Sequence, residues 1–315
     1  MPEGHSVHRL AKRFDQLFVG REVAASSPQG RFAGGATLVD GRWMTRAMAV
    51  GKHMFLEFDN NLWLHVHLGL YGAWDFAGDI TAEALSSPST EGTVVGEHED
   101  SLSSIGAPRR ARLRISEVET LEEDSAVFPA EPVGAVRVRL LTHATVADLR
   151  GPTACEVMRA DEVQAKIATL GPDPIVDAGR KAENRFVAAV MKRAVPIGLL
   201  LMDQSVVAGI GNVYRAEILF RARLDPHTRG RDLDEKTVRA LWKDWTKLLK
   251  IGVETGQMLT RDNLGPNPAR GLMARRANRY WVYHREGLRC RVCDFPIVME
   301  VIGARKLYWC PQDQR

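Results

Sequence analysis

Residues 202–214, Met-Asp-Gln-Ser-Val-Val-Ala-Gly-Ile-Gly-Asn-Val-Tyr, hold the pattern that decides the fold. A short apolar segment leads into the turn Gly209-Ile210-Gly211, and Asn212 follows at the position of a helix cap. Glycines let a phosphate approach the backbone, and the N-terminus of the next helix offers N–H groups to it. A tight turn between two packed helices would have the same sequence. The stretch therefore predicts two helices joined by a turn that serves phosphate binding or packing.

Helical periodicity surrounds this stretch on both sides. Apolar residues recur at intervals of three and four in five segments. The predicted helices cover residues 161–169, 182–194, 197–204, 212–222 and 234–254. Gly171-Pro172-Asp173-Pro174 separates the first two helices. We therefore expect a helical domain over residues 156–265.

The N-terminal region has a different pattern. Residues 5–20 have the amphipathic spacing of a helix, which Gly20 ends. Short runs of strand-forming residues follow, separated by Gly and Asp/Asn turns. These runs are residues 38–39, 54–58, 62–67, 135–140 and 145–149. A helix followed by many short strands predicts an antiparallel β-sandwich or barrel.

An acidic segment interrupts the strands between Gly78 and Pro132. It is rich in Ser, Pro, Gly and Glu, which predicts a largely disordered insertion, with Arg109–Arg114 as a short strand or basic contact. The segment holds 12 acidic and 4 basic side chains, a net charge of −8, whereas the whole chain carries +4. The remainder therefore carries +12, and this surplus favours a polyanionic ligand such as nucleic acid.

Length and composition narrow the class of protein. A chain of 315 residues with 45% hydrophobic residues is long enough for two or three globular domains. It has no recognisable signal peptide and no apolar run near the ~20 residues of a membrane span. Its four cysteines form no disulfide framework, and Cys155 is interpreted as a buried thiol. We expect a cytoplasmic monomer that does not contact membranes.

Pro2 and Glu3 are the first candidates for catalysis. Removal of Met1 would leave Pro2 with a free secondary amine, and an α-amino group titrates near ~7.7–8.0. Attack of this amine on a sugar aldehyde carbon forms an iminium ion that serves as an electron sink for elimination. Glu3 is placed next to it as a proton donor. Met-Pro-Glu is also an ordinary start of a protein. The other motifs have to decide whether this N-terminus is catalytic.

Three further motifs lie before the insertion. Lys52 follows a glycine at a turn before a strand. It is either a functional lysine or an ordinary lysine that is solvated in the turn. His65 and His67 share one face of a strand, which favours a polar or phosphate-facing role over a metal pair. Leu70 and Tyr71 lie in a loop bounded by glycines, where they either wedge into a base stack or pack as local core.

The C-terminal residues predict a metal site. Cys290 and Cys293 are followed after sixteen residues by Cys310, and Asp313 stands where a fourth cysteine would complete a zinc ribbon. This spacing is typical of a closed structural site. The alternative is an incomplete site that hairpin packing alone holds together. Arg305 lies in this hairpin, where its cation can reach a backbone phosphate.

Together these motifs resemble the formamidopyrimidine-DNA glycosylase and endonuclease VIII family of base-excision repair enzymes. The resemblance rests on the Met-Pro-Glu-Gly start, Gly51-Lys52-His53, His67-Leu68-Gly69, the 209–214 turn and the ribbon with Arg305. The Gly-Leu-Tyr-Gly loop is most similar to the endonuclease VIII branch, in its actinobacterial type. The resemblance implies an α+β multidomain fold. Its parts would be an N-terminal β-sandwich over 1–155, a helix–two-turn–helix domain over 156–265 and a zinc finger over 280–315.

The resemblance also implies a reaction and its catalytic residues. Pro2 would attack C1′ of a damaged nucleotide that has been flipped out of the duplex, and a Schiff base would replace the lost base. Glu3 would protonate the sugar as its ring opens, and Lys52 would donate a proton in the elimination chemistry. The product would be a strand cut at the abasic site. Oxidised pyrimidines are the substrates expected from the endonuclease VIII branch.

Damaged DNA is the partner that the resemblance implies. His67, Asn212 and Arg305 would hold the phosphates that flank the lesion. Leu70 and Tyr71 would fill the gap left by the flipped base.

A structural Zn²⁺ is the implied cofactor, held by Cys290, Cys293, Cys310 and Asp313. Asp313 departs from the family's fourth cysteine. Ser6 departs from the acidic residue that the family usually has four positions after the catalytic proline. The main alternative function is a non-catalytic protein that binds damaged or abasic DNA. A zinc-ribbon protein that binds RNA or the ribosome would leave Pro2, Glu3 and Lys52 without a role.

Overall fold

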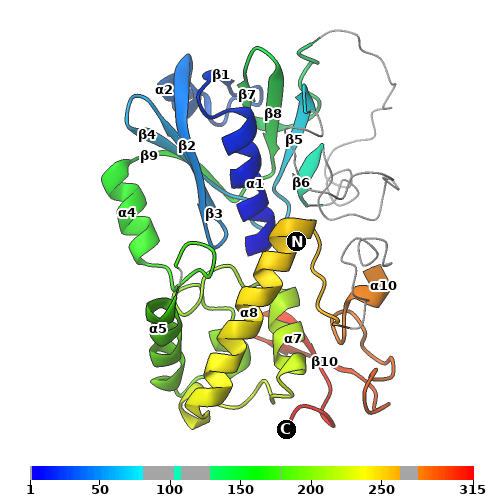
Figure 1. Ribbon diagram of the computed structural model, residues 1–315. Coiled ribbons are helices and arrows are strands. Elements are labelled where there is room, and N and C mark those ends of the chain that lie inside the picture. Colours follow the sequence, from blue (N-terminus) through cyan, green and yellow to red (C-terminus); the bar gives the residue numbers. More distant parts are fainter. Residues whose placement is uncertain (1, 81–102, 108–127, 178, 263–275) are drawn as a thin grey trace. The chain divides into compact units, whose positions relative to one another are not determined.

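The structure is a computed structural model that describes residues 2–80, 103–107, 128–177, 179–262 and 276–315. These residues form two compact units, one ending at Ile167 and the other beginning at Ala168 (Figure 1). Each unit has an apolar core of its own. No helix in the described ranges is long and apolar enough to cross a membrane. The three-domain division stays a prediction.

The first unit is built on a nine-stranded antiparallel sheet. In chain order the strands are β1 (Glu22–Ser26), β2 (Arg42–Val50), β3 (His53–Phe58), β4 (Leu62–His67), β5 (Ala73–Gly78), β6 (Ser104–Gly106), β7 (Val136–Leu141), β8 (Thr145–Arg150) and β9 (Ala154–Arg159). Their order in the sheet is β6-β5-β8-β7-β1-β2-β3-β4-β9. Only two residue pairs join β1 to β2, Glu22 with Trp43 and Val23 with Arg42. The sheet therefore divides at this point into two halves.

The two halves enclose one core together with helix α1 (Gly4–Leu17) (Figure 1). Phe14 of α1, Leu64 of one half and Trp74 of the other are all fully buried in it. The rings of Phe14 and Trp74 meet edge to face with centroids 4.8 Å apart. The predicted β-sandwich and N-terminal helix are confirmed, because two strand layers and one amphipathic helix share this core.

Two elements of the first unit differ from the sequence prediction. Residues 38–39, expected as a strand, end the short helix α2 (Ala33–Val39). A run of two apolar residues carries no periodicity that could separate strand from helix. Strand β9 was not predicted, because the turn at Gly151-Pro152 looks like the end of the sheet. The chain instead turns back there, and β9 pairs with β4 before helix α4 (Ala160–Ala168) begins.

Most of the predicted disordered insertion, including Arg109–Arg114, lies outside the described residues. Strand β6 lies in the described part of it, and Ser104 and Gly106 pair with Asp75 and Ala73 of β5. These residues belong to the sheet and form its outer edge, which corrects the prediction of disorder for them.

The second unit is mainly helical. Its helices are α5 (Arg180–Met191), α6 (Ile197–Leu200), α7 (Asn212–Arg221), the 3₁₀ helix η1 (Gly230–Asp232), α8 (Glu235–Thr255) and α10 (Arg276–Arg279). The helices predicted near residues 182–194, 212–222 and 234–254 are confirmed. The predicted cap is wrong by one position, because Gly211 is the N-cap of α7 and Asn212 is its first helical residue.

A β-hairpin of strands β10 (Val298–Ile302) and β11 (Arg305–Trp309) follows in the same unit. Its two-residue turn, Gly303-Ala304, has φ of +58° at both positions, as a type I′ hairpin turn requires. A Cβ on Gly303 would lie 2.6 Å from Leu199 Cδ2, so this turn packs closely on the end of α6. Leu307 and Tyr308 of β11 share a small apolar core with Phe220 of α7. Helix α7 and the hairpin are therefore one packed assembly.

A buried ion pair crosses β7 and β8. Arg139 Nε and Nη2 donate to Asp148 Oδ1 and Oδ2 at 2.7 and 2.8 Å, and the two residues face each other in register. Arg150 lies 3.7 Å from the same carboxylate and also pairs with Asp75. Asp148 thus balances two cations in the half-sheet.

We predict that Asp148→Ala destabilises the first unit by about 3–5 kcal/mol, because it leaves the buried guanidinium of Arg139 without its carboxylate. Urea unfolding should show an earlier transition for this unit. Asp161→Ala is the control, since Asp161 and its partner Arg159 are both largely exposed. An equal loss of stability in both variants would contradict the prediction.

Candidate functional site

Pro2 and Glu3 lie at the start of α1, and both are buried. Glu3 has extended backbone, and its carbonyl accepts a hydrogen bond from Ser6 N at 3.1 Å, which begins the helix. Ser6 Oγ lies 3.2 Å from His5 Nε2, and both side chains are buried. The small neutral Ser6 fills a place where an acidic side chain would have to lose its water.

Lys52 lies in the turn between β2 and β3, directly after Gly51, whose φ is +60°. Helix α1 packs on both of these strands, so Pro2, Glu3 and Lys52 belong to elements that contact one another. His67 ends β4 and faces His53 across the β3–β4 pair. Burial and the Lys52 cation lower the pKa of His67 to about 4, which makes this imidazole neutral at pH 7.

Leu70 and Tyr71 lie in the turn between β4 and β5 and are 40% and 53% exposed. Local core packing is therefore excluded for both side chains. The turn requires glycine at both ends, because a Cβ on Gly72 would lie 2.3 Å from the Leu68 carbonyl oxygen and φ of Gly69 is +65°. Two apolar side chains on a tight turn form a short wedge.

Asn212 lies at the start of α7 and is only 7% exposed. Its Nδ2 donates to the Lys306 carbonyl at 2.8 Å, and its Oδ1 accepts from Arg215 Nη2 at 2.5 Å. Arg215 is fully buried and donates to the same Lys306 carbonyl at 3.1 Å and to the Gly198 carbonyl at 3.4 Å. Both side chains therefore join α7 to the hairpin, next to Arg305. Arg305 itself is exposed at the first position of β11.

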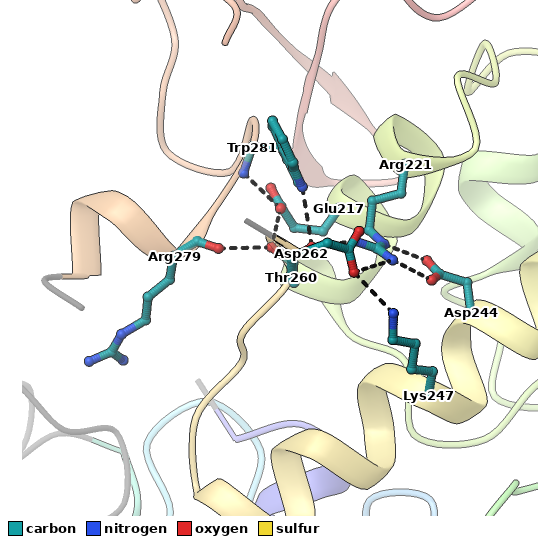
Figure 2. A network of polar contacts seen from close by, with 8 residues as sticks. All are labelled: Glu217, Arg221, Asp244, Lys247, Thr260, Asp262, Arg279 and Trp281. Carbon is teal, nitrogen blue, oxygen red and sulfur yellow. Dashed lines mark hydrogen bonds and ion pairs between the residues drawn. The ribbon is translucent and has the colours of Figure 1, made fainter. Parts of the chain in front are cut away.

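Glu217 lies one turn further along α7 and is fully buried (Figure 2). Its two oxygens accept hydrogen bonds from the backbone N–H groups of Trp281, Val282 and Tyr283 at 2.8–2.9 Å. The hydroxyl of Thr260 contacts the same carboxylate. Burial raises the pKa of Glu217, and these hydrogen bonds oppose that rise. One side chain thus fixes the backbone segment that leads into the C-terminal region.

Arg221 continues this network at the end of α7 (Figure 2). It binds Asp244 of α8 through Nε and Nη2 at 2.8 and 2.7 Å and Asp262 through Nη1 at 2.7 Å. Lys247 also donates to Asp262 at 3.0 Å. Two carboxylates raise the pKa of Arg221, whose charge is permanent in any case. The network ties α7, α8 and the segment after α8 together.

The C-terminal cluster contains the one group of possible metal ligands found among the described residues. The ligand atoms of Cys290, Cys293, Cys310 and Asp313 all lie within 4.8 Å of one another. Cys290 Sγ lies 3.1 Å from Asp313 Oδ2, and Cys293 Sγ lies 3.4 Å from Cys310 Sγ. Zinc binds sulfur at ~2.3 Å and carboxylate oxygen at ~2.0–2.2 Å, so the four groups fit one tetrahedral ion. All four cysteines of the chain are free thiols.

The structure gathers the candidate residues in two groups. Those from Pro2 to Tyr71 lie in the first unit, and Asn212, Arg305 and the metal ligands lie in the second. Sequence reasoning missed Arg215 and Glu217, although two opposite charges among the apolar residues of this helix could have marked them as buried and paired. It also missed the bond between His65 and Glu156, because Glu156 lies on the unpredicted strand β9.

Two family descriptions match the chain. Residues 1–102 match the formamidopyrimidine-DNA glycosylase N-terminal domain, and residues 170–263 match the formamidopyrimidine-DNA glycosylase H2TH domain. The chain is 38% identical over 315 residues to endonuclease 8 1 of Mycobacterium tuberculosis, with 99% of this chain and 98% of that protein covered. Formamidopyrimidine-DNA glycosylase of Thermus thermophilus is 37% identical over 145 residues, which cover 46% of this chain and 53% of that protein.

Solved structures show the same fold. Fpg of Lactococcus lactis in complex with DNA that contains an abasic site aligns with a TM-score of 0.69 at 18% identity, covering 99% of both chains. The Thermus thermophilus MutM (Fpg) protein aligns with a TM-score of 0.64 at 23% identity, covering 99% of this chain and 98% of that one.

We predict that Glu217→Ala loosens the segment Trp281–Tyr283. Three buried N–H groups lose their acceptor, and an unsatisfied buried donor costs about 1–3 kcal/mol. Hydrogen exchange of the amides of residues 281–283 should accelerate by at least about tenfold, the change that ~1.4 kcal/mol produces. Glu235→Ala, at an exposed position in the first turn of α8, should leave these amides protected. Unchanged exchange in Glu217→Ala would show that the carboxylate does not hold the segment.

Proposed function

Because the chain belongs to the formamidopyrimidine-DNA glycosylase and endonuclease VIII family, we propose that it is a bifunctional DNA glycosylase and abasic-site lyase. The observation that carries this proposal is the 38% identity to an endonuclease 8 along 99% of the chain. The order of motifs supports it, since Pro2-Glu3, Lys52 and the Leu70-Tyr71 turn all fall within residues 1–102, which match the N-terminal domain of the family.

Pro2 is proposed as the nucleophile. With Met1 removed, its secondary amine attacks C1′ of the damaged nucleotide, the N–C1′ bond forms, and the bond from C1′ to the base breaks. The base leaves with the bonding electron pair and takes up a proton, and the amine loses its own proton. Glu3 protonates the sugar ring oxygen as the ring opens to an iminium ion. Loss of a proton from C2′ then expels the 3′ phosphate, and water hydrolyses the iminium to release Pro2. Lys52 is proposed as a proton donor in this elimination chemistry.

DNA is the proposed partner, and oxidised pyrimidines are the proposed substrates. The exposed pair Leu70 and Tyr71 is suited to fill the space of a flipped nucleotide. His67, Asn212 and Arg305 are proposed to hold phosphates. Nδ2 of Asn212 carries a second hydrogen beyond the one given to Lys306, and Arg305 presents an exposed guanidinium. A panel of lesion duplexes and single strands would identify the preferred base.

A structural zinc ion is the proposed cofactor. Cys290, Cys293, Cys310 and Asp313 would hold it in a closed four-ligand site. The backbone N–H of Val292 donates to Cys290 Sγ at 3.4 Å, an arrangement that supports a thiolate at this position.

The lyase proposal is tested by reductive trapping. Purified protein that lacks Met1, incubated with abasic duplex and borohydride, should form a covalent protein–DNA adduct. Pro2→Gly exchanges a secondary for a primary amine and should reduce trapping by at least about tenfold, a barrier change of ~1.4 kcal/mol. Pro28→Gly, in an exposed turn of the same unit, is the matched control. Binding of abasic DNA without adduct or cleavage would instead establish a non-catalytic DNA-binding protein.

The metal proposal predicts opposite effects of two substitutions at one position. Asp313→Cys completes a four-thiolate site and should slow the transfer of zinc to a chromogenic chelator by roughly tenfold. Substitutions of residues that only contact metal ligands already change metal affinity by about this factor. Asp313→Ala removes the fourth ligand and should lower the bound zinc per chain, measured by elemental analysis. Equal zinc content and release rate in Asp313→Ala and the parent protein would remove Asp313 from the ligand set.

A further inference from the structure

Three histidines and a glutamate line one face of strands β3, β4 and β9. His53 of β3 faces His67 of β4, and His65 of β4 faces Glu156 of β9. Side chains alternate along a strand, so His65 and His67 point away from the core in which the intervening Val66 is buried. Four polar groups on adjacent strands are thus brought to the sheet face opposite the core.

These groups form a directed chain of hydrogen bonds. Glu156 Oε1 lies 2.8 Å from His65 Nδ1, and His65 Nε2 lies 2.9 Å from His53 Nδ1. An ionised carboxylate can only accept, so His65 must carry its proton on Nδ1. His65 Nε2 then accepts from Nδ1–H of His53. The remaining nitrogen of His53, Nε2, is therefore an unprotonated hydrogen-bond acceptor.

The surroundings keep these rings neutral. His65 is fully buried, whereas the side chain of Glu156 is 51% exposed and in contact with water. The charged groups that face the rings are Glu156, Lys52 and Lys166 of α4. Burial is the largest effect on His53 and, together with His67, His65 and the two lysines, lowers its pKa to about 3. Each imidazole therefore has one proton at neutral pH, as the directed chain requires.

This series of hydrogen bonds ends at the ring of His53. His53 follows Lys52 directly in the sequence, and its ring centroid lies 4.8 Å from that of His67. The Lys52 cation affects both rings, and after burial it is the largest influence on His67. An ammonium group is stabilised by a nearby acceptor nitrogen and opposed by a nearby N–H group. The tautomer of His53 thus affects whether its ring favours the protonated form of Lys52.

We propose that Glu156, His65 and His53 form a positioning relay that fixes the tautomer of His53 and so presents an acceptor nitrogen to Lys52 and His67. The inference rests on the proposed function in so far as Lys52 is the proton donor. None of the three relay residues is proposed to touch DNA. Glu156 acts through His65, and His65 acts through His53.

Glu156→Gln and His65→Leu test the relay. Glu156→Gln removes the charge that sets the tautomer, and His65→Leu removes both ring nitrogens. Nitrogen NMR of the histidine rings should show the proton of His53 on Nδ1 in the parent protein, and a loss of that preference in both variants. NMR titration of Lys52 should show a pKa lower by roughly half to one unit in both variants, the scale of one lost hydrogen bond. Elimination on a preformed abasic duplex should slow, with its alkaline limb shifted to lower pH by the same amount.

Glu57→Gln is the matched control, because it makes the same change of charge on the same face of β3, beyond Phe55. It should leave the His53 tautomer and the Lys52 titration unchanged. A proton on Nε2 of His53 in the parent protein, or an unshifted Lys52 in both variants, would overturn the relay. The two NMR measurements need no turnover, so failure of reductive trapping in the parent protein would count against the proposed function alone.

Discussion

The second unit depends on one buried carboxylate, that of Glu217. A carboxylate without water must find donors, and this one finds three consecutive backbone N–H groups and the Thr260 hydroxyl. Those N–H groups belong to residues 281–283. The hydrogen bonds that compensate for burying the charge therefore also fix the segment that leads to the hairpin. Apolar packing alone would allow this segment to slide along α7, whereas three directed bonds allow one register.

Helix α7 makes three sets of polar contacts with other segments within its ten residues. Asn212 and Arg215 bind the hairpin at its start, Glu217 binds residues 281–283 in its middle, and Arg221 binds two aspartates at its end. The apolar residues between them belong to the helical core and to the hairpin core. The helix is consequently buried on almost every side, and its charges are paired because little water reaches Arg215 and Glu217 and only part of Arg221 is exposed.

The sequence predicts features that depend on neighbouring residues of the chain. It does not predict contacts between residues that are far apart in the sequence. Helices of ten or more residues, the sandwich and the Cys–Asp spacing follow from periodicity and composition. Gly209-Ile210-Gly211 predicts the turn correctly but places the cap one residue late, since a glycine with extended backbone can serve as N-cap. The His65–Glu156 bond depends on β9, a strand whose half-exposed residues and preceding glycine turn carry no strand signal. Pairing between strands far apart in sequence is therefore what the sequence leaves undetermined.

The hairpin with Arg305 has anchors besides the metal cluster. If zinc alone supported Arg305, a weak site of three cysteines and one aspartate would leave this side chain poorly held. The structure adds two bonds to the Lys306 carbonyl, the packing of Gly303 on Leu199 and the burial of Leu307 and Tyr308. The bonds to Lys306 and the contact of Gly303 use neither a cysteine nor Asp313, whereas Leu307 and Tyr308 share their core with Cys290 and Cys310. The position of Arg305 is therefore determined by α7 and α6 as well as by the Cys–Asp cluster, so an aspartate in place of a fourth cysteine can be tolerated there.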